Sequence, residues 1–187
     1  MSRTPSIMIP LGTVLPTFSL PDVVSGNNIT EQLLSGNISV VMFICNHCPY
    51  VKHVNKELVR LANDYMCKGV KFIAISANDA AMYPDDAPDK MKVVAVQLKY
   101  PFPYLYDESQ HTARAFDAAC TPDFYIFDKN KKLAYHGQLD DSRPSLNVPV
   151  TGKDIRDALD NLLNNKPVSA LQRPGIGCNI KWKQSNS

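Results

Sequence analysis

The stretch Cys45–Pro49 (CNHCP) constrains the fold most, because it separates a buried strand pattern from a helix pattern. Residues 38–44 (ISVVMFI) form a short apolar run rich in β-branched residues, which is typical of a strand covered on both faces. From residue 49 to about residue 66 apolar residues recur at helical spacing, and a second β-rich run follows at residues 70–76. This succession predicts a strand, a helix and a strand that form a βαβ unit of a parallel sheet.

The remainder of the chain alternates in the same way, which predicts an α/β fold. The further elements expected are a helix at 88–99, a strand at 104–106, a helix at 109–119, a β-hairpin of strands 123–128 and 133–138, and a helix at 153–163. The tail from residue 164 is interrupted by proline and glycine, so it is expected to be irregular. A length of 187 residues suits one domain, 1–187, with a core at about 15–165 and a tail at 166–187.

Charge and composition argue against two classes of partner. The 20 basic and 18 acidic side chains are scattered and give a formal net charge of +2. Such a balance offers no basic surface for nucleic acid or for an anionic membrane. We therefore expect neither partner.

The N-terminal twenty residues contain Pro5, Pro10, Gly12 and Pro16, which interrupt any continuous apolar segment of the kind that export or membrane insertion requires. The expected location is the cytoplasm. Structural disulfides are rare in that compartment, so the five cysteines are expected to be core residues, metal ligands or catalytic thiols.

Two cysteines separated by two residues at the start of a helix suit redox chemistry. The strand-to-helix junction is expected to put Cys45 at the helix N-terminus, where the macrodipole and unpaired N–H groups would lower its pKa. An offset of three residues brings Cys48 to the same side, within disulfide reach of Cys45. His47 would stabilise the Cys45 thiolate further, although a solvent-facing histidine of little effect is the alternative. No acidic residue stands near the motif in the sequence to accept a proton.

These residues resemble the thioredoxin-fold redoxins of the alkyl hydroperoxide reductase/thiol-specific antioxidant superfamily, in particular the peroxiredoxin-like branch with a CxxC motif. The resemblance extends from residues 15–22 (LPTFSLPD) through the motif to residues 177–183 (GCNIKWK). It implies a thioredoxin-like fold, with a central mixed sheet flanked by helices, an N-terminal extension and an irregular C-terminal tail. It also implies antioxidant or redox activity without a cofactor.

Thr121 and Pro122 look like the cis-proline loop that faces the CxxC motif in this fold. The resemblance implies that they form a substrate platform, with the backbone of Thr121 free to pair with an extended peptide. The alternative is a trans proline that merely opens a strand.

The other three cysteines have ordinary explanations as well as functional ones. Cys67 is expected to be a small buried residue at the end of a helix. Cys120 could approach the redox pair as a third thiol or ligand, or simply pack in the core. Cys178, in the glycine-rich tail, could reach the site as an additional resolving thiol or be inert.

The leading functional hypothesis is a thiol-disulfide oxidoreductase in which Cys45 attacks a substrate disulfide and Cys48 resolves the mixed disulfide. Expected partners are protein or small-molecule disulfides and a cellular thiol reductant such as a thioredoxin or glutathione system. The first alternative is a thiol peroxidase. The peroxiredoxin pattern has proline and threonine or serine seven and three residues before the reactive cysteine, however, and Ile38 and Met42 occupy those places before Cys45.

The second alternative is a copper- or zinc-binding redoxin. Its candidate ligands are Cys45, Cys48, His47, Cys120 and His136. The short CxxC spacing and the lack of a second such motif favour redox chemistry, so no metal is expected.

Overall fold

The computed structural model describes residues 3–184. The predicted domain span of 1–187 and tail of 166–187 therefore include residues 1–2 and 185–187, which lie outside the described part of the chain. No helix among the described residues is long and apolar enough to cross a membrane.

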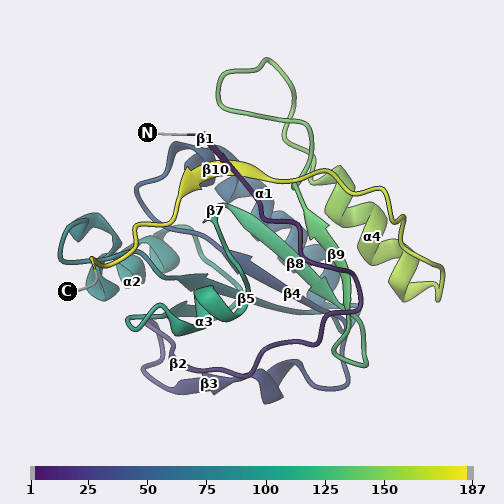
Figure 1. Ribbon diagram of the computed structural model, residues 1–187, viewed down its shortest axis with the longest axis horizontal. Coiled ribbons are helices and arrows are strands. Elements are labelled where there is room, and N and C mark those ends of the chain that lie inside the picture. Colours follow the sequence, from purple (N-terminus) through teal and green to yellow (C-terminus); the bar gives the residue numbers. More distant parts are fainter. Residues whose placement is uncertain (1–2, 185–187) are drawn as a thin grey trace.

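A five-stranded mixed sheet forms the centre of the molecule, with strand order β6-β5-β4-β8-β9 (Figure 1). Strands β4, β5 and β6 run parallel, whereas β8 is antiparallel to both β4 and β9. The bounds are β4 Ser39–Phe43, β5 Lys71–Ser76, β6 Tyr104–Tyr106, β8 Asp123–Phe127 and β9 Leu133–Gly137. The predicted βαβ unit and hairpin are both present.

The helices are α1 Pro49–Met66, α2 Pro88–Gln97, α3 His111–Ala115 and α4 Lys153–Leu163, with 3₁₀ turns η1 Glu31–Leu34 and η2 Pro84–Asp86. Helices α1, α2 and α4 agree with the predicted ranges to within two residues. The predicted helix 109–119 is wrong at both ends, because Gln110 and Asp117 have positive φ angles of 63° and 50°. Left-handed backbone cannot continue a right-handed helix, so α3 is confined between them.

The alternation along β4 divides the core into two layers. Val40 and Met42 point to the face covered by α1, α2 and α4. Val41 and Phe43 point to the opposite face, where α3 and the N-terminal segment cover the sheet. Both faces are therefore buried, which is why residues 38–44 are apolar except for Ser39. α1 ends at Met66, and Gly69, with a φ of 87°, completes the turn into β5.

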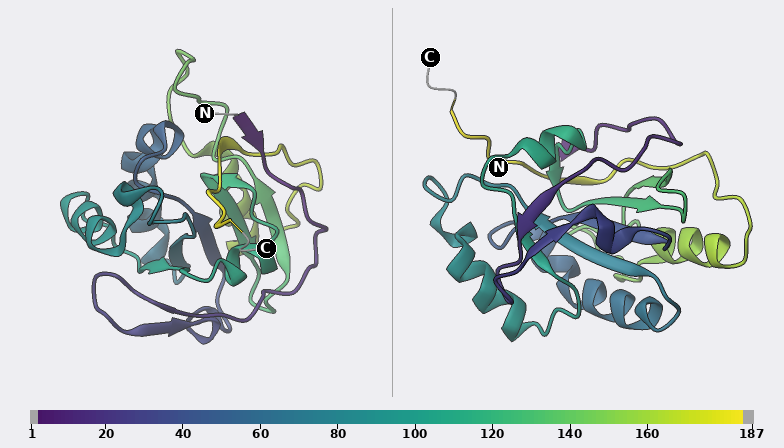
Figure 2. Two further views of the ribbon diagram at one scale, coloured as in Figure 1. Left: turned by 60° about the vertical axis from the view of Figure 1, so that its left-hand side comes forward. Right: turned by 90° about the horizontal axis from the view of Figure 1, so that it is seen from below.

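The structure also contains two smaller sheets that were not predicted from the sequence. Strands β2 Ser19–Pro21 and β3 Asn28–Thr30 form an antiparallel pair. Strands β1 Arg3–Pro5, β10 Ile176–Asn179 and β7 Cys120–Thr121 form a three-stranded sheet in which β10 is central. β1 and β10 consequently lie side by side, although they come from opposite ends of the chain (Figures 1 and 2). The tail is irregular from residue 164 to residue 175, as predicted, but then adds the strand β10.

Truncation of Leu58 tests whether the packing of α1 on the sheet stabilises the fold. Leu58 is fully buried, so Leu58→Ala leaves a cavity and is expected to lower the free energy of unfolding by about 2–5 kcal/mol. Val93→Ala in α2 is the control, because Val93 is 49% exposed and the expected change is within about 0.5 kcal/mol. Urea unfolding followed by circular dichroism measures both. Equal effects of the two substitutions would contradict the assigned packing.

Candidate active site

Helix α1 begins at Pro49, and Cys48 is its N-cap residue. Proline is favoured at the first helical position because it has no N–H to leave unpaired and its φ is already helical. The prediction that Cys45 lies at the helix N-terminus is therefore wrong. Cys45 belongs to the bend between β4 and α1, and Cys48 is the cysteine next to the free N–H groups of the first turn.

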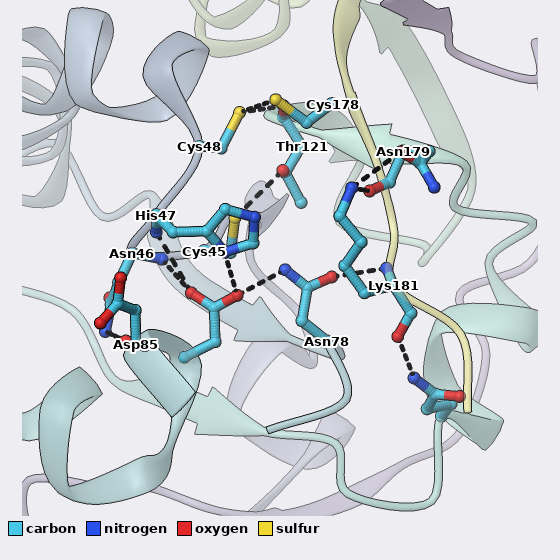
Figure 3. A network of polar contacts seen from close by, with 12 residues as sticks. Cys45, Asn46, His47, Cys48, Asn78, Asp85, Thr121, Cys178, Asn179 and Lys181 are labelled. Atoms are coloured by element: carbon cyan, nitrogen blue, oxygen red, sulfur yellow. Dashed lines mark hydrogen bonds and ion pairs between the residues drawn. The ribbon is translucent and has the colours of Figure 1, made fainter. Parts of the chain in front are cut away.

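Thr121 brings the two cysteines of the motif together (Figure 3). The Cys45 Sγ atom lies 3.3 Å from Thr121 Oγ1, and the Cys48 thiol donates a hydrogen bond to the Thr121 carbonyl oxygen at 3.2 Å. Both cysteines are buried, with 2% and 0% of their surfaces exposed. All five cysteines lie in the described part of the chain, and none of them is in a disulfide.

The two thiols of the motif have opposite tendencies to ionise. The pKa of Cys48 is lowered, chiefly by a hydrogen bond with Cys45, and further by Cys178 and the Val51 N–H, while burial opposes the shift. The pKa of Cys45 is raised by the hydrogen bond with Cys48, by burial and by the negative charge of Asp86. The direction of these shifts favours ionisation of Cys48 over Cys45, whereas the sequence led us to expect the thiolate at Cys45.

His47 faces a carboxylate that is distant in the sequence. Its Nδ1 atom lies 2.5 Å from Asp86 Oδ2, and its ring stacks on Tyr83 with 5.4 Å between the centroids. Only 13% of the His47 side chain is exposed. The hydrogen bond to Asp86 raises the pKa of His47, against the opposing effect of burial. His47 is thus not a solvent-facing residue: its ring is paired with Asp86, and one of its nitrogens lies within 4.8 Å of the Cys45 sulfur.

Asp86 holds the motif in its conformation. The backbone N–H groups of Asn46 and His47 donate to Asp86 Oδ1 at 2.8 and 3.2 Å, and Asn78 donates to Oδ2 at 2.7 Å. Burial tends to raise the pKa of Asp86, but the hydrogen bonds from the His47 ring, from Asn78 and from the Asn46 N–H lower it below its ordinary value. Asp86 comes from η2, so no signal in the sequence near the motif could have found it.

The peptide bond between Thr121 and Pro122 is cis, as the resemblance implied. The backbone of Thr121, however, is not free to pair with a peptide. It already pairs with Cys178 of the chain's own strand β10. The Cys178 Sγ atom lies 2.7 Å from Cys48 Sγ, and Cys178 is buried. The sequence suggested that Cys178 could reach the site from the tail or be inert. The structure places Cys178 in the site, next to Cys48.

The remaining candidates lie elsewhere. Cys120 is buried against Ser6 Oγ at 3.9 Å and has a pKa raised by burial. His136 Nε2 lies 3.0 Å from Asp123 Oδ1, and both side chains are fully buried. The partner of His136 is thus Asp123 and not Cys45 or Cys48. Cys67 is exposed, which contradicts its predicted burial.

Of the suggested metal ligands, the structure groups Cys45 and His47 with Asp86. One potential ligand atom from each lies within 4.8 Å of the others. The oxygens of Asp86 already accept hydrogen bonds from Asn46, His47 and Asn78, so this carboxylate serves to orient the motif. The donor set gives no independent support for a metal.

The model of the AhpC/TSA family matches residues 11–136. The crystal structure of an uncharacterized conserved protein from Geobacillus kaustophilus is 60% identical, with a TM-score of 0.97 over 99% of this chain and 98% of that one. A thioredoxin family protein from Chlorobium tepidum TLS, 17% identical, superposes with a TM-score of 0.64 over 83% of this chain and 99% of that one. The latter likeness concerns the fold, which is thioredoxin-like as expected.

A curated relative is the thiol:disulfide interchange protein DsbE of Allochromatium vinosum. It is 27% identical over 60% of this chain, and the match spans 58% of the relative's own length.

Substitution of Asp86 tests the electrostatic assignment of His47. Asp86→Asn removes the negative charge that raises the pKa of His47, so this pKa is expected to fall. A pH titration of the histidine ring signals by NMR measures it. Asp85→Asn, which removes an exposed neighbouring carboxylate, is the control and should have a smaller effect. An unchanged His47 titration in Asp86→Asn would show that the pair has been assigned wrongly.

Proposed function

This chain belongs to the AhpC/TSA family, and from that premise we propose that it is a thiol-disulfide oxidoreductase whose working couple is Cys45 and Cys48. The name of the Allochromatium vinosum relative, a thiol:disulfide interchange protein, supports the proposal by similarity. The observation that supports the proposal most directly is the arrangement of the two thiols. Cys45 and Cys48, which have pKa shifts in opposite directions, both contact Thr121 beside the start of helix α1.

Cys48 is the attacking sulfur in this proposal. The nucleophile in disulfide exchange is the thiolate, and the lowered pKa of Cys48 provides one at neutral pH. Its sulfur attacks one sulfur of the substrate disulfide and forms a mixed disulfide. The other substrate sulfur leaves with the electron pair of the broken bond and takes up a proton.

Cys45 resolves the mixed disulfide. It loses its proton, attacks Cys48 Sγ and forms the Cys45–Cys48 disulfide, while the second substrate sulfur departs as a thiol. The substrate thus gains two electrons and two protons. The chain supplies both electrons and the proton of Cys45, and the second proton comes from the solvent because Cys48 was already ionised. The order of attack is the reverse of the order expected from the sequence, because the hydrogen bond with Cys45 and, to a lesser extent, Cys178 and the Val51 N–H favour ionisation of Cys48.

His47 is suited to handle a proton in these steps. Its pKa is raised by the hydrogen bond to Asp86, and its ring lies in the same cluster as the Cys45 sulfur. An imidazolium can donate to the departing substrate thiolate. Asp86 acts through His47 and is therefore a positioning residue.

A cleft of about 800 Å³ beside His47 suggests the route by which a substrate arrives. Lys52 and Lys181 line it together with Met82 and Tyr83. The two lysines outnumber the carboxylate of Asp85 in the lining, so the cleft suits a disulfide compound that carries carboxylates beside an apolar part. The redox sulfurs themselves are buried, so a substrate must displace part of their cover before it reacts.

A cellular thiol, such as a thioredoxin or glutathione, would return the two electrons. If the chain works in the cytoplasm, as its sequence leads us to expect, the reducing conditions there favour net reduction of substrates.

Cysteine variants test the proposed function in a disulfide-reduction assay. Oxidised glutathione or insulin is the substrate and dithiothreitol the electron source. Cys48→Ser is expected to lower the rate over background by roughly 100-fold or more, because it removes the nucleophile. Cys67→Ser is the control and should keep the wild-type rate, since Cys67 is exposed and outside the site.

Hydrogen peroxide consumption is measured beside it, since a thiol peroxidase is the rival function. Faster turnover of peroxide than of disulfides by the wild type would favour the rival. Wild-type protein that reduces no disulfide, or Cys48→Ser protein that reduces it normally, would refute the proposal.

A further inference from the structure

Strand β10 occupies the backbone edge that an extended substrate would use. It runs antiparallel to β7, with Cys178 opposite Thr121 and Asn179 opposite Cys120. Its other edge pairs with β1, where Cys178 faces Arg3. In β-strand addition, a bound peptide would pair with the backbone of Thr121. Cys178 occupies the position that a cysteine of such a peptide would take. The strand that fills this peptide position, β10, belongs to the protein itself.

Glycine allows β10 to approach this closely. A Cβ atom on Gly177 would lie 2.0 Å from the carbonyl oxygen of Thr121, and a Cβ on Gly175 would lie 2.8 Å from Ser6 Oγ. Any side chain at residue 177 would push the strand away from β7. The glycine next to Cys178 is therefore what brings its sulfur down to the start of α1.

The sulfur of Cys178 points at that of Cys48 (Figure 3). The two Sγ atoms are 2.7 Å apart, only about 0.7 Å more than a disulfide bond. The sulfur of Cys45 is directed instead at Thr121 Oγ1. Cys48 thus has a thiol on each side, one from the motif and one from β10.

We propose that Cys178 is a third redox thiol, which resolves mixed disulfides at Cys48 and forms a Cys48–Cys178 disulfide as an alternative to Cys45–Cys48. This inference rests on the proposed function, because it needs Cys48 to take part in disulfide exchange. Cys178 loses a proton and attacks Cys48 Sγ, so the Cys48–Cys178 bond forms and the bond from Cys48 to its former partner breaks. The former partner leaves with the electron pair and takes up the proton.

The same step converts one internal disulfide into the other. When the former partner is Cys45, no electrons enter or leave the chain, and Cys45 returns to the thiol form. Burial and the hydrogen bond with Cys48 raise the pKa of Cys178 to about 12, so that Cys178 remains a thiol while Cys48 is ionised. Once Cys48 is joined to a partner it no longer carries the charge, and the Cys178 thiol next to it is the group that can lose a proton and attack.

Mapping of disulfides after oxidation tests the proposal. Reduced wild type, Cys45→Ser, Cys178→Ser and Cys67→Ser proteins are treated with oxidised glutathione, alkylated with N-ethylmaleimide and digested with trypsin. In Cys45→Ser we expect the peptide that ends at Lys52 to be joined to the peptide that ends at Lys181. In Cys178→Ser we expect only a disulfide within the first of these peptides, and Cys67→Ser should behave as wild type.

Turnover adds a second readout. Cys45→Ser should keep part of the wild-type disulfide-reduction rate, and Cys45→Ser/Cys178→Ser should lose it and accumulate glutathione on Cys48. Gly177→Ala should slow formation of the Cys48–Cys178 link while Cys45–Cys48 still forms, because the added methyl group displaces β10.

The third thiol is refuted if Cys45→Ser protein carries glutathione stably on Cys48 while Cys178 is recovered alkylated. That result differs from a failure of the proposed function, in which wild-type protein would form no disulfide at Cys48 and reduce no substrate.

Discussion

The proposed chemistry depends on one sulfur at the start of a helix, that of Cys48, whose lowered pKa favours the thiolate. Cys48 is the N-cap of α1, and hydrogen bonds that join its sulfur to Cys45 and Cys178 lower its pKa. Each contact lowers the energy of the thiolate, and together they outweigh the burial that opposes it. The helix is held on the sheet by its apolar face, so the packing of the core fixes the position of the charge.

Two other segments complete the environment of this sulfur. η2 supplies Asp86, which binds two backbone N–H groups of the motif and the ring of His47. β10 supplies Cys178 and covers the edge of β7. A site built in this way offers its nucleophile two internal partners and no open backbone edge, which distinguishes it from one designed to bind an extended peptide.

Much of the fold could be predicted from periodicity, because β4, α1, β5 and the β8–β9 hairpin have strong local patterns. The cis bond at Pro122 also agreed with the resemblance. The N-cap position of Cys48 was predictable in principle, since proline at the first helical position makes the preceding residue the N-cap. The contacts of Asp86 and Cys178 were not, because they join residues about 40 and 130 positions apart, and no local pattern encodes such pairing.

The most direct test of this account is the pH titration of thiolate absorbance at 240 nm in the reduced protein. The account predicts that a thiolate step occurs below neutral pH in the wild type, persists in Cys67→Ser and disappears in Cys48→Ser. A wild type that shows no such step, or a step that survives in Cys48→Ser and vanishes in Cys45→Ser, would contradict it.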